Sequence, residues 1–283
     1  MQRLLVISFA LAGCEWGGGT DATGNLQVPD AKSAADARRP DAAIDAAKLD
    51  GTAANPRHLL LTEIALAGAG AEFVEIYNPG PQPVDLQHYY LSDNGNYFTL
   101  PAAVPTISQG DFVVQFSAGA TLAAGGVMTV ALGTAAAFNA AYGSMPTYSI
   151  ADATVTVTTA SGTPSLTDAG EIVVLFQWDG TSALVKDVDI MLAGAPTASN
   201  GLVSKSGYAQ LASTYAVDAN TIANQASAPA AGTSTKRIAA EPGHETQANL
   251  GNGIYGDDET SEDTAATWDA TFDAPTPGAV PAL

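Results

Sequence analysis

The stretch AEFVEIYNPGPQPVDL, which begins at Ala71, contains the two carboxylates whose type and spacing come nearest to a catalytic acid and base. Glu72 and Glu75 lie three positions apart inside an otherwise apolar run. A glycosidase-type reaction needs two carboxyl groups that flank the same bond. In an extended strand, residues an odd number of positions apart point to opposite faces of the sheet. The spacing therefore predicts framework carboxylates that accept hydrogen bonds from loop backbone or hydroxyl groups, and not a catalytic pair.

Other catalytic and metal-binding motifs are incomplete in this sequence. The histidines are His58, His88 and His244, and the pair His244-Glu245 lacks the second histidine of H-E-x-x-H because Ala248 stands there. The sequence contains no G-x-S-x-G motif that would present a nucleophilic serine. We therefore predict no catalytic residue, no metal ligand and no cofactor, and we expect that the protein is not an enzyme.

An acidic run at 256–263, GDDETSED, holds five carboxylates within seven residues. Clustered carboxylate oxygens are the ligands that calcium prefers. The spacing of an EF-hand fails, since Ser261 stands at the fifth ligand position and Glu262 stands where glycine belongs. A solvated loop is the simpler interpretation, and a calcium site in this loop is the alternative.

The charge of the chain is strongly acidic, with a formal net charge of −19 and a pI near 4.1. From residue 58 onward the sequence has four Lys and Arg against 22 Asp and Glu. Nucleic-acid affinity depends on cationic side chains that neutralise phosphates. A body with this excess of negative charge is expected to repel phosphate backbones, so we predict no nucleic-acid partner.

The N-terminus holds the one cysteine, which excludes an intrachain disulfide. Arg3 precedes a run of ten apolar or small residues, 4–13, which is too short to span a bilayer as a helix but suits the core of a signal peptide. The run ends in LAGC, which resembles the lipobox of bacterial lipoproteins. That resemblance implies removal of residues 1–13, lipid attachment to Cys14 and a location at the bacterial outer membrane, facing either the periplasm or the outside.

Residues 14–57 are expected to be the lipidated cysteine and a tether. The segment is rich in Ala, Asp and Pro and has no aromatic residue after Trp16. A chain of this composition cannot bury enough apolar surface to offset its ordering entropy, so it is predicted to be disordered.

The body, 58–283, is predicted to consist of many short strands separated by turn signals. Asp179-Gly180 between two apolar runs favours a hairpin with a type I′ turn. One short helix is expected, capped by Thr134 and ended by Gly143, with Phe138 and Tyr142 on one face. Trp178 and Trp268 are expected to be core residues.

Several segments of the body together resemble the lamin tail domain. They are LLLTEIALAGAGAEFVEIYNPGPQPVDLQHYYLSD from Leu59, the Tyr142-Gly143 helix end, LTDAGEIVVLFQWDG from Leu166 and the closing PTPGA from Pro275. The resemblance covers most of 58–283 and implies an all-β, immunoglobulin-like antiparallel β-sandwich with one short helix. The sequence departs from the family at an insertion near 194–235.

The resemblance implies a non-enzymatic, membrane-anchored lipoprotein that presents a β-sandwich as a binding or envelope-structural module. Its expected partners are the membrane, through the lipid on Cys14, and a protein or cell-envelope component. Two alternatives stay open. One is a calcium-stabilised adhesion module, and the other is a metal-dependent hydrolase with its site in the 194–235 insertion or the acidic loops.

Overall fold

The structure of the protein is a computed structural model that describes most of the chain after the expected tether. The described residues are 58–66, 71–166, 170–194, 203–219, 233–241, 244–245, 250–269 and 273–283. They belong to one compact unit, Gly51–Leu283. The expected signal peptide, Cys14 and the tether lie outside the described residues.

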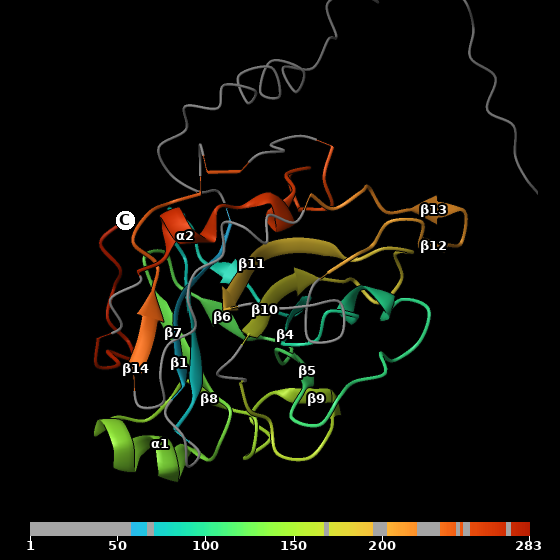
Figure 1. Cartoon of the computed structure of the whole chain (residues 1–283). Helices are drawn as coiled ribbons and strands as arrows, with labels where there is room; N and C mark the ends of the chain where they lie inside the picture. The colour runs from blue at the N-terminus through green and yellow to red at the C-terminus, as the bar shows by residue number, and fades with distance from the viewer. Residues whose placement is uncertain are drawn as a thin grey trace, which may run out of the picture. The chain divides into compact units, whose positions relative to one another are not determined.

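Two five-stranded sheets form the body, with the strand orders β14-β1-β2-β7-β8 and β11-β10-β4-β5-β9 (Figure 1). The first sheet contains β1 (Leu60–Leu66), β2 (Phe73–Tyr77), β7 (Val127–Ala131), β8 (Tyr148–Ser149) and β14 (Thr233–Lys236). The second contains β4 (Tyr89–Ser92), β5 (Phe112–Gln115), β9 (Thr156–Ala160), β10 (Gly170–Gln177) and β11 (Lys186–Gly194). Two short ladders pair β3 (Val84–Asp85) with β6 (Thr121–Leu122), and β12 (Ala209–Gln210) with β13 (Ser213–Thr214). Among the described strands, only β7 and β8 pair in parallel.

Apolar side chains cover both faces of each sheet, which explains why the strands read as nearly continuous apolar runs. The main core combines residues of both sheets, such as Val74, Ile76 and Val130 from the first and Val173 and Leu175 from the second. A second core lies on the other face of β10, and a third lies under the helix α1. The second core includes Tyr90, Tyr97, Phe98, Val174, Phe176, Val203 and Tyr215. The third comprises Ala65, Phe73, Ala131 and Phe138.

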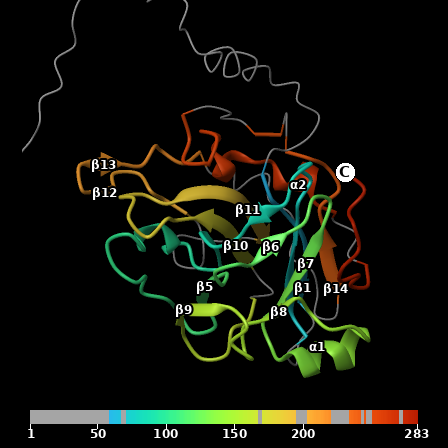
Figure 2. The same ribbon diagram turned by 180° about the vertical axis from the view of Figure 1, so that it is seen from behind.

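The expected helix is present as α1 (Ala135–Tyr142). The Thr134 hydroxyl accepts a hydrogen bond from the Ala137 amide at 3.2 Å, and Gly143 ends the helix with φ +72°. The rings of Phe138 and Tyr142 lie 4.8 Å apart, as one helix face requires. Helix α1 and the β12–β13 hairpin lie at opposite ends of the body (Figures 1 and 2).

The fold class is therefore confirmed as an antiparallel β-sandwich, with one addition. A second short helix, α2 (Thr264–Thr267), follows the acidic run and was not predicted from the sequence. No helix among the described residues is long and apolar enough to cross a membrane.

The predicted two-residue turn at Asp179-Gly180 is wrong, although the hairpin itself is present. Strands β10 and β11 pair from Gln177 with Lys186, so the connection is 178–185. Gly180 does adopt a positive φ of 79°. The Asp179 carboxylate instead accepts hydrogen bonds from the amides of Thr181 and Ser182 at 2.8 and 2.6 Å. This local Asx-type turn satisfies the backbone of a longer loop, which the dipeptide alone does not reveal.

Part of the 194–235 insertion is folded into the body. Residues 203–219 contain the β12–β13 hairpin and bury Val203 and Tyr215 in the second core. The Tyr215 hydroxyl accepts a hydrogen bond from the Val185 amide and donates one to the Phe98 carbonyl, each at 2.9 Å. The rest of the insertion lies outside the described residues.

Candidate functional site

Charged side chains are buried in this body to an unusual extent. Asp and Glu are rarely buried unless they are paired. Among the residues that the structure describes, ten acidic side chains are buried: Glu63, Glu75, Asp93, Glu171, Asp187, Asp189, Glu241, Asp258, Glu259 and Glu262. The cations Lys205 and Arg237 are buried as well. The composition alone led us to expect this charge on the surface, and much of it is inside because the carboxylates bond to other parts of the chain.

The two glutamates of the opening stretch serve the framework, as predicted. The Glu72 carboxylate accepts a hydrogen bond from the Leu166 amide at 2.9 Å. Glu75 accepts one from the Thr62 hydroxyl at 3.0 Å and one from the Gly278 amide at 2.6 Å. Burial raises the pKa of Glu75 to about 7. The two side chains therefore attach separate loops to opposite faces of β2.

The C-terminal segment is held against β1 in the same way. Glu63 accepts hydrogen bonds from the Ser234 hydroxyl at 2.5 Å and the Thr276 amide at 2.9 Å. A cavity of about 290 Å³ lies beside this edge, and its lining includes Glu63, Glu75, Lys236 and residues 279–282.

Arg237, directly after β14, is the centre of a buried charged cluster. Its Nη1 donates to Glu262 at 2.7 Å, and its Nη2 donates to both oxygens of Asp189 at 2.8 and 2.9 Å. Its Nε donates to the Leu61 carbonyl at 2.8 Å, and the guanidinium lies 5.1 Å from the centre of the Trp268 ring. Burial alone would lower the pKa of Arg237, but the surrounding carboxylates raise it above its usual value. Arg237 thus joins β1, β11 and the acidic run.

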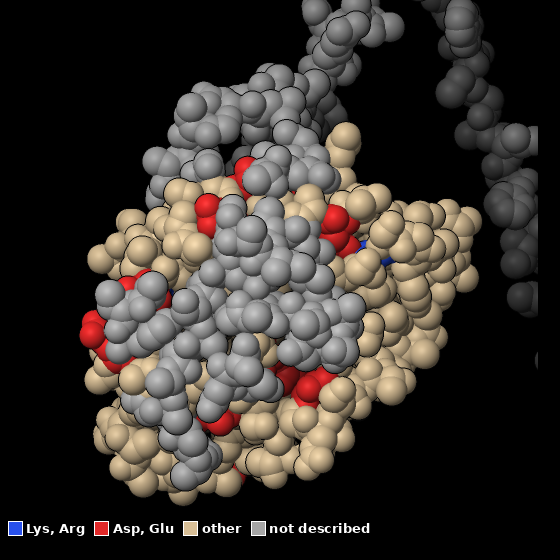
Figure 3. Space-filling view, in the orientation of Figure 1, with Lys and Arg blue, Asp and Glu red and all other residues tan. Residues whose placement is uncertain are grey.

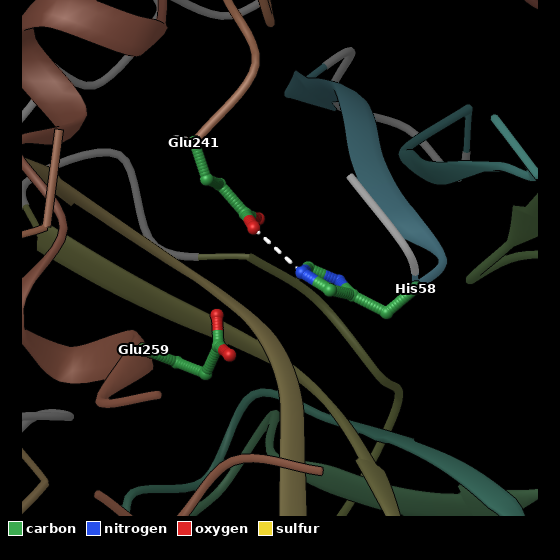
Figure 4. Close-up of side chains that lie close together, drawn as sticks. All are labelled: His58, Glu241 and Glu259. Carbon is green, nitrogen blue, oxygen red and sulfur yellow. Dashed lines mark ion pairs between the residues drawn. The ribbon is translucent and has the colours of Figure 1, made fainter. Parts of the chain in front are cut away.

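His58 and Glu241 form a second contact beside this cluster, and Glu259 faces it (Figure 4). His58 Nε2 lies 2.7 Å from a Glu241 oxygen, and its Nδ1 lies 3.0 Å from the Leu59 carbonyl. Burial lowers the pKa of His58, but the Glu241 carboxylate outweighs it and raises the pKa to about 9. Burial, followed by the carboxylates of Glu241 and Glu245, raises the pKa of Glu259 well above its usual value.

Ligand atoms of two residue triplets lie within 4.8 Å of one another, which is close enough to share a metal ion. One triplet is His58, Glu241 and Glu259, and the other is Asp189, Glu241 and Glu262. Arg237 contacts all three members of the second triplet. Of the three histidines, only His58 belongs to such a group among the described residues.

Part of the chain that positions these residues matches a known family. Residues 52–192 match the Lamin Tail Domain family. This chain carries a lamin tail domain. The match confirms the resemblance at β1, β2, β4 and β10, and it ends at Leu192 within β11. His58 and Asp189 therefore lie inside the matched range of the lamin tail domain, whereas Arg237, Glu241 and Glu259 lie beyond it.

The chain is also similar to a solved structure, that of a DUF4876 family protein from Bacteroides thetaiotaomicron VPI-5482. The sequence identity is 13%, the similarity covers 80% of this chain and 72% of that chain, and the TM-score is 0.38. A TM-score at this level supports no argument about fold or function. No curated protein matches the sequence.

A separate buried ion cluster attaches the insertion to the lamin tail domain. Lys205 Nζ donates to Asp187 at 2.8 Å and to Asp218 at 2.7 Å. Asp187 also accepts from the Tyr97 hydroxyl at 2.5 Å, and Asp218 accepts from the Asn252 amide group at 3.1 Å. Burial alone would lower the pKa of Lys205, but the two carboxylates raise it. With each charge paired and hydrogen-bonded, this cluster has the character of a structural connection.

The acidic run does not gather its own carboxylates around one point. The Asp258 carboxylate accepts hydrogen bonds from the Thr260 hydroxyl at 2.6 Å and the Ala219 amide at 2.9 Å. Glu259 and Glu262 point into the body and join different triplets. The simple solvated loop that we expected is therefore wrong for these residues, because both side chains are buried and Glu262 pairs with Arg237.

The tryptophan predictions are confirmed in part. Trp268 is buried and stacks against Arg237. Trp178 is only partly buried, packs beside the second core and donates its indole N–H to the Ser182 carbonyl at 2.9 Å.

His58 and the acidic run that holds Glu259 and Glu262 were visible in the sequence, but their partners Lys205, Arg237 and Glu241 were not predicted. His58 and Glu241 stand near opposite ends of the body sequence, and no spacing rule connects them. The one available signal was compositional, since Lys205 and Arg237 are two of only four Lys and Arg residues from residue 58 onward, against 22 Asp and Glu.

Proposed function

We propose that this protein is a membrane-anchored lipoprotein whose lamin tail domain acts as a binding or structural module of the bacterial cell envelope. In this proposal a lipid on Cys14 holds the chain at the outer membrane. Residues 15–57 form the tether, and a flexible coil of that length reaches about 35–40 Å. The body then presents its loops to a protein or cell-envelope partner without chemical turnover.

The observation that carries the proposal is the use of carboxylates as framework. Glu63, Glu72 and Glu75 each accept hydrogen bonds from segments distant in the sequence. Such bonds fix loops on a rigid scaffold, which is the requirement for a display module. The match to the lamin tail domain family supports the β-sandwich scaffold of this proposal.

The distribution of charge supports a partner other than nucleic acid. Two of the four cations of the body, Lys205 and Arg237, are buried and therefore cannot contact phosphates. The face of the molecule in Figure 3 shows acidic patches among uncharged surface and very little basic surface. A partner with exposed cationic or polar groups fits this surface better than a phosphate backbone does.

The experiment that tests the anchor compares the wild-type protein with Cys14→Ala in membrane fractions of the producing bacterium. We expect the wild type in the membrane pellet and Cys14→Ala in the soluble fraction, since the thiol is the point of lipid attachment. Cys14→Ser serves as a near-isosteric control and should behave like the alanine variant. A Cys14→Ala protein that stays as firmly in the membrane would overturn the anchor.

Protease treatment of intact cells then tests display. Loss of the body from intact cells would place its partners outside the cell, whereas protection until the outer membrane is opened would place them in the periplasm. Turnover of hydrolase substrates by the purified body, abolished by a chelator, would contradict the non-enzymatic proposal.

A further inference from the structure

We propose that His58, Glu241 and Glu259 form a binding site for a divalent transition-metal ion such as zinc. The site lies beside the Arg237 cluster and combines the start of β1 with the two segments that follow β14. The inference is independent of the lipid anchor at Cys14, so either proposal can fail without the other.

The positions of the ligand atoms suit a small metal ion. One ring nitrogen and two carboxylate oxygens lie within 4.8 Å of one another. Ligand atoms about 2.0–2.1 Å from a tetrahedral zinc ion lie roughly 3.4 Å apart. In the proposed site, rotations of the His58, Glu241 and Glu259 side chains bring the three ligand atoms to that separation.

The imidazole of His58 is held as a metal-binding histidine usually is. Its Nδ1 lies 3.0 Å from the Leu59 carbonyl and donates a hydrogen bond to it. Such a bond to a backbone carbonyl fixes the ring and directs the other nitrogen toward the metal. Nε2 is therefore the ligand atom, and it already faces the Glu241 carboxylate at 2.7 Å.

Glu259 supplies an independent sign that a cation belongs here. Its side chain is 2% exposed, and its Oε2 has no hydrogen-bond partner among the described residues. Figure 4 shows this carboxylate pointing toward the His58–Glu241 pair. Glu241 Oε1 is likewise buried without a hydrogen bond. Glu241 Oε1 also lies 3.6 Å from Arg237 Nη2, so the Glu259 oxygen carries the argument. Buried polar atoms almost always have partners, and a buried carboxylate oxygen without one, aimed at a histidine, fits a cation at this point.

In the neighbouring triplet, a cationic side chain stands where a metal ion would stand in the first. Glu241 also belongs to the group with Asp189 and Glu262, where the Arg237 guanidinium supplies the positive charge. Among the described residues, no lysine or arginine forms an ion pair with Glu259. A metal ion would do for the first triplet what Arg237 does for the second.

The ligand types favour a transition metal over calcium. Imidazole nitrogen is a common ligand of zinc and related ions, whereas calcium takes six to eight oxygen ligands. Three protein ligands leave a fourth position of a tetrahedral zinc ion for water or for a group of a bound partner.

Calorimetric titration of the metal-free, full-length chain with zinc chloride tests the site, with protein purified without a histidine tag. We expect one zinc ion per chain, and a rise in melting temperature that the same concentration of calcium chloride does not produce. Glu259→Gln should weaken zinc binding at least about 100-fold. Mutation of a residue that only hydrogen-bonds to a metal ligand typically lowers metal affinity about 10–100-fold, and Glu259 is itself a proposed ligand. Glu75→Gln is the matched control, since Glu75 is equally buried at 2% exposed and belongs to neither triplet; it should bind zinc like the wild type.

Folding of the variants can be checked in the same experiment. Without metal, Glu259→Gln should melt no lower than the wild type, because it replaces a buried carboxylate whose Oε2 has no hydrogen-bond partner. Cobalt(II) as a second probe should give a visible absorption band that His58→Gln abolishes. The proposal is overturned if the wild type binds no zinc, or if Glu259→Gln binds it with wild-type affinity.

Discussion

Glu75 illustrates how burial sets the behaviour of single residues in this protein. Its alternation with Glu72 in an extended strand was readable from the sequence, because side-chain direction in a strand has a fixed period of two. The groups that donate hydrogen bonds to Glu75 could not be read from the sequence, since one of them, the Gly278 amide, lies near the far end of the chain. The sequence could therefore exclude a catalytic pair, but it could not identify the contacts that replace one.

The raised pKa of Glu75 predicts a specific dependence of stability on pH. The folded-state pKa of about 7 lies above the usual value of 4.5, so the folded protein holds this proton more tightly than the unfolded chain does. Its contribution to the free energy of unfolding is full below about pH 4.5 and is lost as the pH rises through 7. The shift corresponds to at most about 3 kcal/mol.

Urea unfolding of the wild type and Glu75→Gln between pH 4 and pH 8 measures this contribution. We expect the wild type to lose up to about 3 kcal/mol relative to Glu75→Gln over that range, because the glutamine cannot ionise. Taking the difference between the two proteins cancels the other titrating groups. A difference that does not change with pH would show that Glu75 ionises normally.

At the scale of elements, α1 shows where local signals suffice. Thr134, the apolar face and Gly143 predicted the helix to its ends, because capping hydrogen bonds involve neighbours in the sequence. The β10–β11 connection shows the opposite case. The dipeptide Asp179-Gly180 favoured a tight turn, but the pairing of Gln177 with Lys186 produced a longer loop.

The cap of α1 gives a prediction for this scale. Thr134→Ala removes the acceptor for the Ala137 amide and should lower the free energy of unfolding by about 1 kcal/mol. Thr134→Ser keeps the hydroxyl and should restore most of the loss. Thermal or urea unfolding measures both, and an alanine variant as stable as the serine variant would show that the hydrogen bond contributes nothing.

At the scale of the whole molecule, buried ion pairs join segments far apart in the chain. Arg237 connects β1, β11 and the acidic run, and Lys205 connects the insertion to β11. Breaking a buried pair is costly because it leaves an uncompensated charge in a medium of low dielectric. The segments beyond Leu192, where the family match ends, are thus integral to this version of the domain.

Lys205→Met tests whether the insertion stabilises the fold. The substitution leaves Asp187 and Asp218 without their cation and should lower the free energy of unfolding by about 3–5 kcal/mol. Lys186→Met is the control, since Lys186 is an exposed residue of β11 and its replacement should change stability by less than about 0.5 kcal/mol. Equal stability of the two variants would show that the insertion is only attached to the surface.

The sequence alone determined the properties that depend on near neighbours and on composition. These are the all-β class, the framework role of Glu72 and Glu75, the capped helix, and the expectation of a lipidated Cys14 followed by a tether. Strand alternation and helix capping act over a few residues, so they can be read along the chain.

Only the tertiary structure decided which charges lie inside and which side chains meet. His58, Glu241 and Glu259 converge because β1 and the segments after β14 fold onto the same part of the sandwich. Burial then makes each charge dependent on a partner from another segment. Such pairings are set by the three-dimensional path of the chain, and therefore no local pattern in the sequence encodes them.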